Sequence, residues 1–202
     1  MSGRLADDGE KLVTFIRPVL EVLSQRSEDA KNRLLDAGDI ARTRLRVYWS
    51  EGHQDYIARA LLQPYAAALR ARNIPPDRTH ARGHCPFCGG SAWIGVRRSR
   101  PEAESGFRYL QCSLCGLEWN IGRIFCPSCF EEDPYKLPQF QSDVHRNVRI
   151  EACETCHRYI KSIDLTLDAR PVPEIDDLLS LSMDLWAAEE GYTRIEPGIA
   201  GI

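Results

Sequence analysis

The fold of this chain is decided by four cysteine pairs of one spacing, Cys85-Pro-Phe-Cys88, Cys112-Ser-Leu-Cys115, Cys126-Pro-Ser-Cys129 and Cys153-Glu-Thr-Cys156, which hold all eight cysteines. Two residues between the cysteines allow both sulfurs of a pair to point the same way. Two such turns can therefore close a tetrahedral site of four thiolates around one metal ion. Because thiolates bind zinc and iron alike, the sequence predicts two metal ions per chain, iron or zinc.

An internal repeat indicates which pairs belong together. Each cysteine of segment 85–115 lies 41 residues before a cysteine of segment 126–156, and Arg108 maps onto Arg149 at the same offset. A duplicated unit carries its own four ligands, so the sites are predicted in sequential order. Site 1 is Cys85, Cys88, Cys112 and Cys115, and site 2 is Cys126, Cys129, Cys153 and Cys156. The alternative is the crossed arrangement of RING-type domains, which joins the first pair to the third.

Other chemistries fit the cysteines less well. Four disulfides would need an oxidising compartment, and the c-type haem motif from Cys153 to His157 would claim two cysteines that the repeat already uses. Thiol redox catalysis by one pair would need a βαβ pattern, which is absent. Four thiolates leave no open metal position, and no nucleophile elbow, phosphate-binding glycine loop or His-Glu-x-x-His motif occurs. We therefore expect no catalytic residue and no enzymatic activity.

Composition narrows the class of protein further. The chain has 202 residues, 43% hydrophobic and 27% charged, which is typical of a globular protein. Its net charge is −3, and eight metal-bound thiolates would make it more negative, which disfavours nucleic acid as a partner. No apolar stretch is long enough to span a bilayer, and the N-terminus does not read as a secretory signal. We expect a cytoplasmic protein.

Hydrophobic periodicity predicts helices on both sides of the cysteines. Apolar residues recur at helical spacing over 12–23 and again over 56–69, with a proline expected to interrupt each run, and Asn73-Ile-Pro-Pro-Asp77 ends the second. A C-terminal helix is predicted from Pro173 to a cap at Gly191. Its broad apolar surface is expected to pack on the N-terminal helices, with a partner-binding face as the alternative.

Strand-like runs lie between the cysteine pairs and predict small antiparallel hairpins at 93–96 with 107–110, and at 148–150. The expected fold class is therefore α+β, with two tandem rubredoxin-like or zinc-ribbon modules between helical parts. The predicted divisions are a helical region over 1–82, a first metal module over 83–122, a second over 123–170, and a C-terminal helix and tail over 171–202.

The cysteine segment and its flanks resemble one known family. The run Gly106-Phe-Arg-Tyr-Leu-Gln-Cys112 leads through Glu118-Trp119 and Arg123 to the third pair, and Glu189-Glu-Gly-Tyr192 closes the segment. Over about residues 83–194 the chain resembles the formate dehydrogenase accessory protein FdhE family. The resemblance implies a cytoplasmic maturation factor that contacts the catalytic subunit of formate dehydrogenase, and it implies a metal-ligand role for all eight cysteines.

The short joint between the modules is the candidate partner surface. Trp119 and Arg123 lie in this joint, and tryptophan and arginine are favoured anchors of protein interfaces. Packing between the modules is the alternative role for Trp119. Two other functions remain open: a zinc-ribbon protein that binds nucleic acid through Arg97, Arg98 and neighbouring aromatic residues, and a small rubredoxin-like electron carrier.

Overall fold

The computed structural model describes residues 56–75, 82–100, 103–166, 168 and 170–198. The chain divides into two compact units, 1–77 and 78–202. The helix predicted over 12–23 lies outside the described residues. The four divisions expected from the sequence stay a prediction.

The helix predicted over 56–69 is present as α4 (Tyr56–Ala71), but the predicted interruption at Pro64 is wrong. Pro64 is exposed, and the helix continues through it although its ring removes one backbone hydrogen bond. The helix ends where the sequence predicts. Asn73 turns the backbone to a φ of 52°, and the amide of Ile74 bonds the carbonyl of Leu69 at 2.9 Å, which satisfies the last turn.

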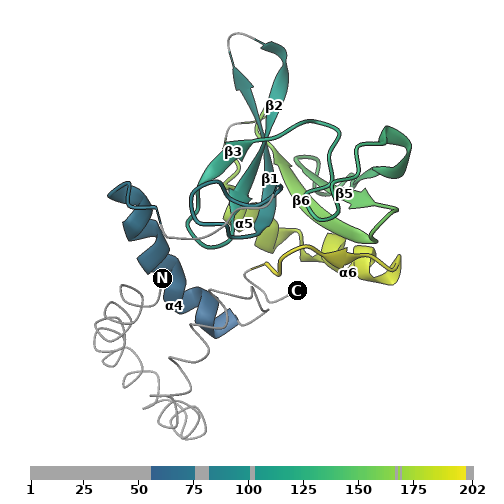
Figure 1. Ribbon diagram of the computed structural model, residues 1–202. Helices are drawn as coiled ribbons and strands as arrows, with labels where there is room; N and C mark the ends of the chain where they lie inside the picture. The colour runs from purple at the N-terminus through teal and green to yellow at the C-terminus, as the bar shows by residue number, and fades with distance from the viewer. Residues whose placement is uncertain (1–55, 76–81, 101–102, 167, 169, 199–202) are drawn as a thin grey trace, which may run out of the picture. The chain divides into compact units, whose positions relative to one another are not determined.

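The second unit is built on one mixed sheet with strand order β3-β2-β1-β6-β5-β4, and β7 pairs with β6 (Figure 1). The strands are β1 (Ala92–Arg100), β2 (Ala103–Cys112), β3 (Glu118–Asn120), β4 (Gln139–Gln141), β5 (Val148–Cys153), β6 (Arg158–Asp164) and β7 (Thr193–Arg194). A short 3-10 helix, Pro134–Lys136, precedes β4. The predicted strand runs all lie inside these strands, and the expected α+β class is confirmed.

The repeat is visible in the sheet, because each repeat segment together with the strand that follows it gives three antiparallel strands. Segment 85–115 and the strand after it supply β1, β2 and β3, and segment 126–156 and the strand after it supply β4, β5 and β6. We call these two parts the first and the second copy. The two halves join through the parallel pair of β1 and β6, from Ile94 opposite Lys161 to Arg97 opposite Asp164. At this seam a Cβ on Gly95 would lie 2.9 Å from the Ser162 hydroxyl, so close pairing needs glycine.

The seam also carries the main hydrophobic core. Ile94 and Val96 of β1 are fully buried with Ile163 of β6, and Val148 and Ile150 of β5 extend the same cluster. A smaller cluster joins Ala92, Leu110 and Ile160, so it also contains residues of both copies. The two copies therefore share their cores.

The C-terminal helix begins at Pro173 as predicted, but it divides into α5 (Pro173–Leu179) and α6 (Leu181–Glu189). The break at Ser180 has a local cause. The ammonium group of Lys161 in β6 donates to the Asp177 carbonyl at 2.6 Å and to the Ser180 hydroxyl at 3.1 Å. In a continuous helix that carbonyl would accept the amide four residues on, so Lys161 competes with the helix for it.

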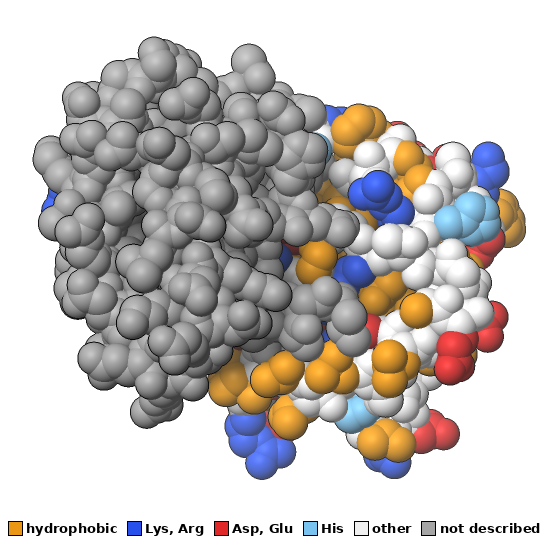
Figure 2. Space-filling model, turned by 90° about the horizontal axis from the view of Figure 1, so that it is seen from below, with side chains coloured by type: hydrophobic (Ala, Val, Ile, Leu, Met, Phe, Trp, Pro, Cys, Tyr) orange, Lys and Arg blue, Asp and Glu red, His pale blue; other side chains and the backbone are white. Residues whose placement is uncertain are grey.

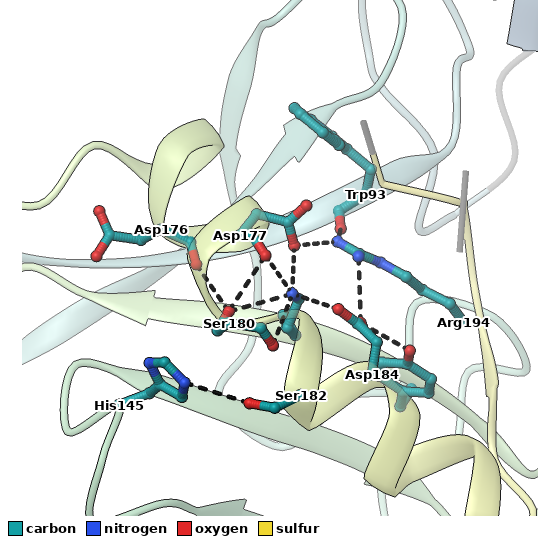
Figure 3. Close-up of polar contacts among 10 residues, drawn as sticks. Trp93, His145, Asp176, Asp177, Ser180, Ser182, Asp184 and Arg194 are labelled. Atoms are coloured by element: carbon teal, nitrogen blue, oxygen red, sulfur yellow. Dashed lines mark hydrogen bonds and ion pairs between the residues drawn. The ribbon is translucent and has the colours of Figure 1, made fainter. Parts of the chain in front are cut away.

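A buried charge network holds both helices to the sheet (Figure 3). Lys161, with no exposed surface, lies 3.0 Å from an Asp177 carboxylate oxygen and 2.5 Å from one of Asp184. Arg194 of β7 pairs with the same two carboxylates at 2.5 and 3.2 Å and donates to the Trp93 carbonyl. Two cations thus face two carboxylates, which is the condition for burying charge.

This network determines which side of α5 faces the sheet. Its acidic side chains face the protein: Asp177 is buried, Asp176 accepts from the Asn147 amide, and Glu174 accepts from Gln111. The apolar side chains point outward, with Ile175 55%, Leu178 44% and Leu179 68% exposed. On α6 the apolar side chains face the sheet as the helical pattern predicts, because Met183 and Ala187 pack in its core. The predicted packing of the C-terminal helix on the N-terminal helices stays a prediction.

Replacing Lys161 with methionine should destabilise the protein strongly. The change leaves two buried carboxylates with Arg194 as their remaining cation, and breaking a buried ion pair typically costs about 3–5 kcal/mol. Urea unfolding of the metal-loaded protein measures the loss. The control is Lys136→Met, whose half-exposed side chain pairs with Glu131 at 3.6 Å, and we expect a change below about 1 kcal/mol. Equal effects in both variants would contradict the network's role.

Candidate metal centres

The four cysteine pairs adopt one turn. In each pair the residue after the second cysteine has a positive φ: 68° at Gly89, 67° at Gly116, 68° at Phe130 and 52° at His157. The amide of that residue donates to the carbonyl of the first cysteine at 2.8, 3.2, 2.9 and 2.9 Å respectively. A turn of this kind directs both sulfurs to one side. Glycine adopts it freely, whereas Phe130 and His157 do so with strain.

The turns bring the sulfurs together in two groups of four, the groups that the repeat predicts. In the first group the Cys85 and Cys115 sulfurs are 3.6 Å apart, and those of Cys88 and Cys112 are 3.4 Å apart. The corresponding distances in the second group are 3.7 Å for Cys126 to Cys156 and 3.5 Å for Cys129 to Cys153. All ligand atoms of a group lie within 4.8 Å of one another. The crossed arrangement is not seen.

These distances fit a metal ion. Four sulfurs at about 2.3 Å from a central zinc form a tetrahedron whose edges are about 3.8 Å. The described hydrogen bonds also favour thiolates, because the amides of Leu114 and Cys115 donate to the Cys112 sulfur at 3.3 and 3.4 Å. Each group could therefore hold one tetrahedral ion, and the role of the eight cysteines as ligands stays a prediction.

Burial makes a counter-charge necessary in the second group. Burial raises the pKa of the Cys126 thiol, and it also raises the pKa of the Cys156 thiol. Four thiolates in such surroundings repel one another and lose hydration, so they need a cation between them. A divalent metal supplies that charge directly.

The two groups differ in how far water reaches them. Site 1 is closed, since its four cysteines are at most 1% exposed. In site 2 Cys126 and Cys153 are buried, while Cys129 and Cys156 lie partly at the surface.

A buried ion pair ties the two copies together beside site 2. The Arg108 guanidinium of β2 pairs with Glu151 of β5 at 2.6 Å and donates to the carbonyls of Gly122 and Phe125. Arg108 of the first copy is thereby bonded both to the joint, through Gly122 and Phe125, and to the second copy, through Glu151. A small surface pocket next to this pair is lined by Cys126, Cys153, Arg123 and Arg158 among others.

The two candidate partner residues occupy different settings. Trp119 in β3 is partly buried and packs on the cluster of Ala92, Leu110 and Ile160. Part of the Trp119 side chain is therefore used in packing within the sheet. Arg123 is exposed and donates to the Gly106 carbonyl at 3.4 Å. Whether either residue contacts a partner stays a prediction.

Sequence reasoning missed the buried charges. Asp177 and Asp184 are seven residues apart in a segment of apolar helical pattern, which puts both on one helix face. Two acids on one face, with Lys161 in an apolar strand run, were a readable signal of buried pairing.

No helix among the described residues is both long enough and apolar enough to cross a membrane.

Comparisons with known proteins agree with the cysteine pattern. Two family models match consecutive segments: "FdhE, central domain" over residues 84–123 and "FdhE, C-terminal domain" over residues 124–199. Each matched segment contains one group of four cysteines. Together the matches cover more than half of the chain.

Individual proteins that are similar to this chain are also described as FdhE proteins. A protein FdhE homolog of Pseudomonas putida is 31% identical over 96% of this chain and 66% of its own length. A protein FdhE homolog of Aquifex aeolicus is 34% identical over 59% of this chain and 42% of its own length. The crystal structure of the FdhE protein from Pseudomonas aeruginosa aligns with a TM-score of 0.58 and 32% identity, over 70% of this chain and 50% of that one. The chain thus spans less than two thirds of the length of these relatives.

Changing Cys85 and Cys88 to serine should lower the metal content from two ions per chain to one. The variant removes half of the ligands of site 1 and leaves the sulfurs of site 2 in place. Elemental analysis of protein purified without added metal gives the number of ions and their identity. The matching variant, Cys126→Ser with Cys129→Ser, should also retain one ion. A protein that keeps two ions in either case would contradict the grouping.

Removing both ions should loosen the sheet around the cysteine pairs. Metal binding to small thiolate modules contributes roughly 10–16 kcal/mol at neutral pH. Hydrogen exchange after treatment with a strong chelator should therefore accelerate across 85–156. An unchanged pattern would show that the shared core holds these strands without metal.

Proposed function

The chain belongs to the FdhE family, and from this premise we propose that it is an accessory factor that binds the catalytic subunit of formate dehydrogenase and is needed for the activity of that enzyme. The observation that carries the proposal is a pair of four-sulfur groups built into one sheet, within the segment that matches both FdhE domains. Four thiolates fill a tetrahedral ion, so such metals suit a structural or electron-carrying role better than substrate binding. The proposal includes a non-enzymatic role.

The eight cysteines act as the ligands of two ions in this proposal. The sulfur spacings support it, as do the four turns of one geometry. Both zinc and iron suit four thiolates. A cytoplasmic location is part of the proposal, because thiolates there stay reduced and available to metal.

The outward face of α5 supports a protein partner. Val172, Ile175, Leu178 and Leu179 follow one another at helical spacing and are all exposed, and Leu185 of α6 is 59% exposed. Figure 2 shows hydrophobic side chains at several places on the described surface seen from below. Exposed apolar side chains that lie close together are typical of a surface that another protein covers.

Few charges border this face. Glu174 and Asp176 of α5 turn toward the protein, where they accept from Gln111 and Asn147. The exposed charges of 171–198 are Glu189 and Glu190, at the end of α6. We therefore propose that α5 docks on an apolar surface of the catalytic subunit. Trp119 and Arg123 remain a second proposed contact, for which the partial burial of Trp119 leaves a smaller free surface.

One observation favours an electron-carrying role as the second candidate. The partly exposed Cys129 and Cys156 would bring an iron ion in site 2 close to a partner's surface. Nucleic-acid binding has less support. Arg98 pairs with Glu118 at 2.7 Å, and Arg97 lies 3.8 Å from Asp164, which Arg149 also approaches at 3.1 Å. Both arginines therefore already have a carboxylate partner within the protein.

Co-purification tests the proposed partner. The tagged chain, produced in a host that makes formate dehydrogenase, should retain the catalytic subunit, and deletion of its gene should abolish formate oxidation. Failure of both would overturn the function. A Trp119→Ala, Arg123→Ala variant with two bound ions should bind less of the subunit, and unchanged binding would remove only these two residues from the proposal.

Replacing Leu178 and Leu179 with serine should reduce retention of the subunit by at least tenfold. Both side chains are exposed, so the change removes apolar docking surface without opening the core. The matched control is Tyr135→Ser with Val144→Ser, two exposed apolar residues outside α5 and α6, which should bind normally. Equal binding by both variants would contradict docking through α5. A change in the mass of the free protein would instead point to pairing of two copies of this chain.

A further inference from the structure

The two four-cysteine groups can be compared position by position, because the repeat offset is 41 residues. The residue that follows the first turn of each copy is Gly90 in the first and Glu131 in the second. The residue inside the second turn is Leu114 in the first and Thr155 in the second. These four residues surround equivalent parts of the two sites.

Site 1 is sealed by apolar atoms at these positions. A Cβ on Gly90 would lie 2.8 Å from the Cys112 sulfur and 3.2 Å from the Leu114 Cβ, so the backbone lies directly on the site. Leu114 itself is 1% exposed. Water and larger reagents therefore meet packed atoms on this side of the sulfurs.

Site 2 has polar groups and an opening at the same positions. The Thr155 hydroxyl donates to the Glu131 carboxylate at 2.6 Å, and that bond lies at the surface. The residues directly after the second cysteine of each pair, Phe130 and His157, are exposed, and Phe130 stacks on Phe125. Cys129 and Cys156 are consequently the two ligands that solvent reaches.

We propose that the two metal sites have different chemistry: site 2 exchanges its metal and reacts with soft electrophiles through Cys129 and Cys156, whereas site 1 holds its metal permanently. This inference rests on the proposed binding of metal by both groups. It goes beyond the proposed function because it assigns exchange to one site, whatever the partner.

The exchange step is a ligand substitution without electron transfer. With metal bound, Cys129 and Cys156 would be the ligands released first, because their sulfurs lie partly at the surface. Sulfur or nitrogen donors of an incoming chelator would replace the cysteine sulfurs and carry the ion away in its original oxidation state, and each released thiolate would take up a proton from water.

Timed alkylation of the zinc-loaded full chain tests the proposal. The probe is N-ethylmaleimide at limiting concentration, and mass spectrometry of the peptides reports the rate at each cysteine while a zinc dye reports release. Cys129 and Cys156 should react at least tenfold faster than Cys85 and Cys88, and one zinc equivalent should leave in the fast phase. Equal rates, or faster reaction in site 1, would overturn this inference alone. Protein that binds no metal at either site would overturn the proposed function with it.

Leu114→Thr copies the site 2 residue into site 1 and gives a second test. Alkylation of the site 1 cysteines should then accelerate at least fivefold, with site 2 unchanged. The matched control is Leu179→Thr, the same change at an exposed position, which should leave both rates unchanged. An unaltered site 1 in a folded Leu114→Thr protein would contradict sealing by Leu114. If this variant does not fold, the order of alkylation in the native chain decides.

Discussion

The parallel pairing of β1 with β6 makes one sheet out of two halves that could not fold separately. Each copy of the repeat supplies three antiparallel strands, which are too few to enclose a core. The seam turns these halves into one sheet and buries Ile94, Val96 and Ile163 along it. It also places Lys161 in the middle of the sheet, where its ammonium group reaches both C-terminal helices.

Lys161 then determines how the C-terminal segment lies. Hydrophobic burial alone would turn Ile175, Leu178 and Leu179 of α5 toward the sheet. Asp177 is instead drawn inward by Lys161 and Arg194, and the leucines are left outside. Buried ion pairs often contribute little net stability, so their consequence here lies in orientation. They give the protein an apolar surface at a fixed position.

The duplication preserved the cysteine turns and changed their surroundings. All four turns keep the same backbone geometry, even where phenylalanine and histidine replace glycine. The covering residues diverged, from Gly90 and Leu114 to Glu131 and Thr155. The sulfurs of site 1 are packed inside their half of the sheet, whereas two of the four cysteines of site 2 lie partly at the surface. The Arg108–Glu151 pair couples the halves, so both sites rest on one framework.

Features that depend on spacing and on residues near one another in the chain could be predicted from the sequence. Spacing and repeat predicted the grouping of the eight cysteines, the hairpins before Cys112 and Cys153, and the start of a helix at Pro173, because each depends on neighbouring residues. The order of strands, the break at Ser180 and the outward face of α5 could not be read in the same way. They depend on Lys161 and Arg194, which meet Asp177 and Asp184 only after the sheet has formed. These three features follow from the folded arrangement, since the energy of a buried charge depends on partners that lie far away in the chain.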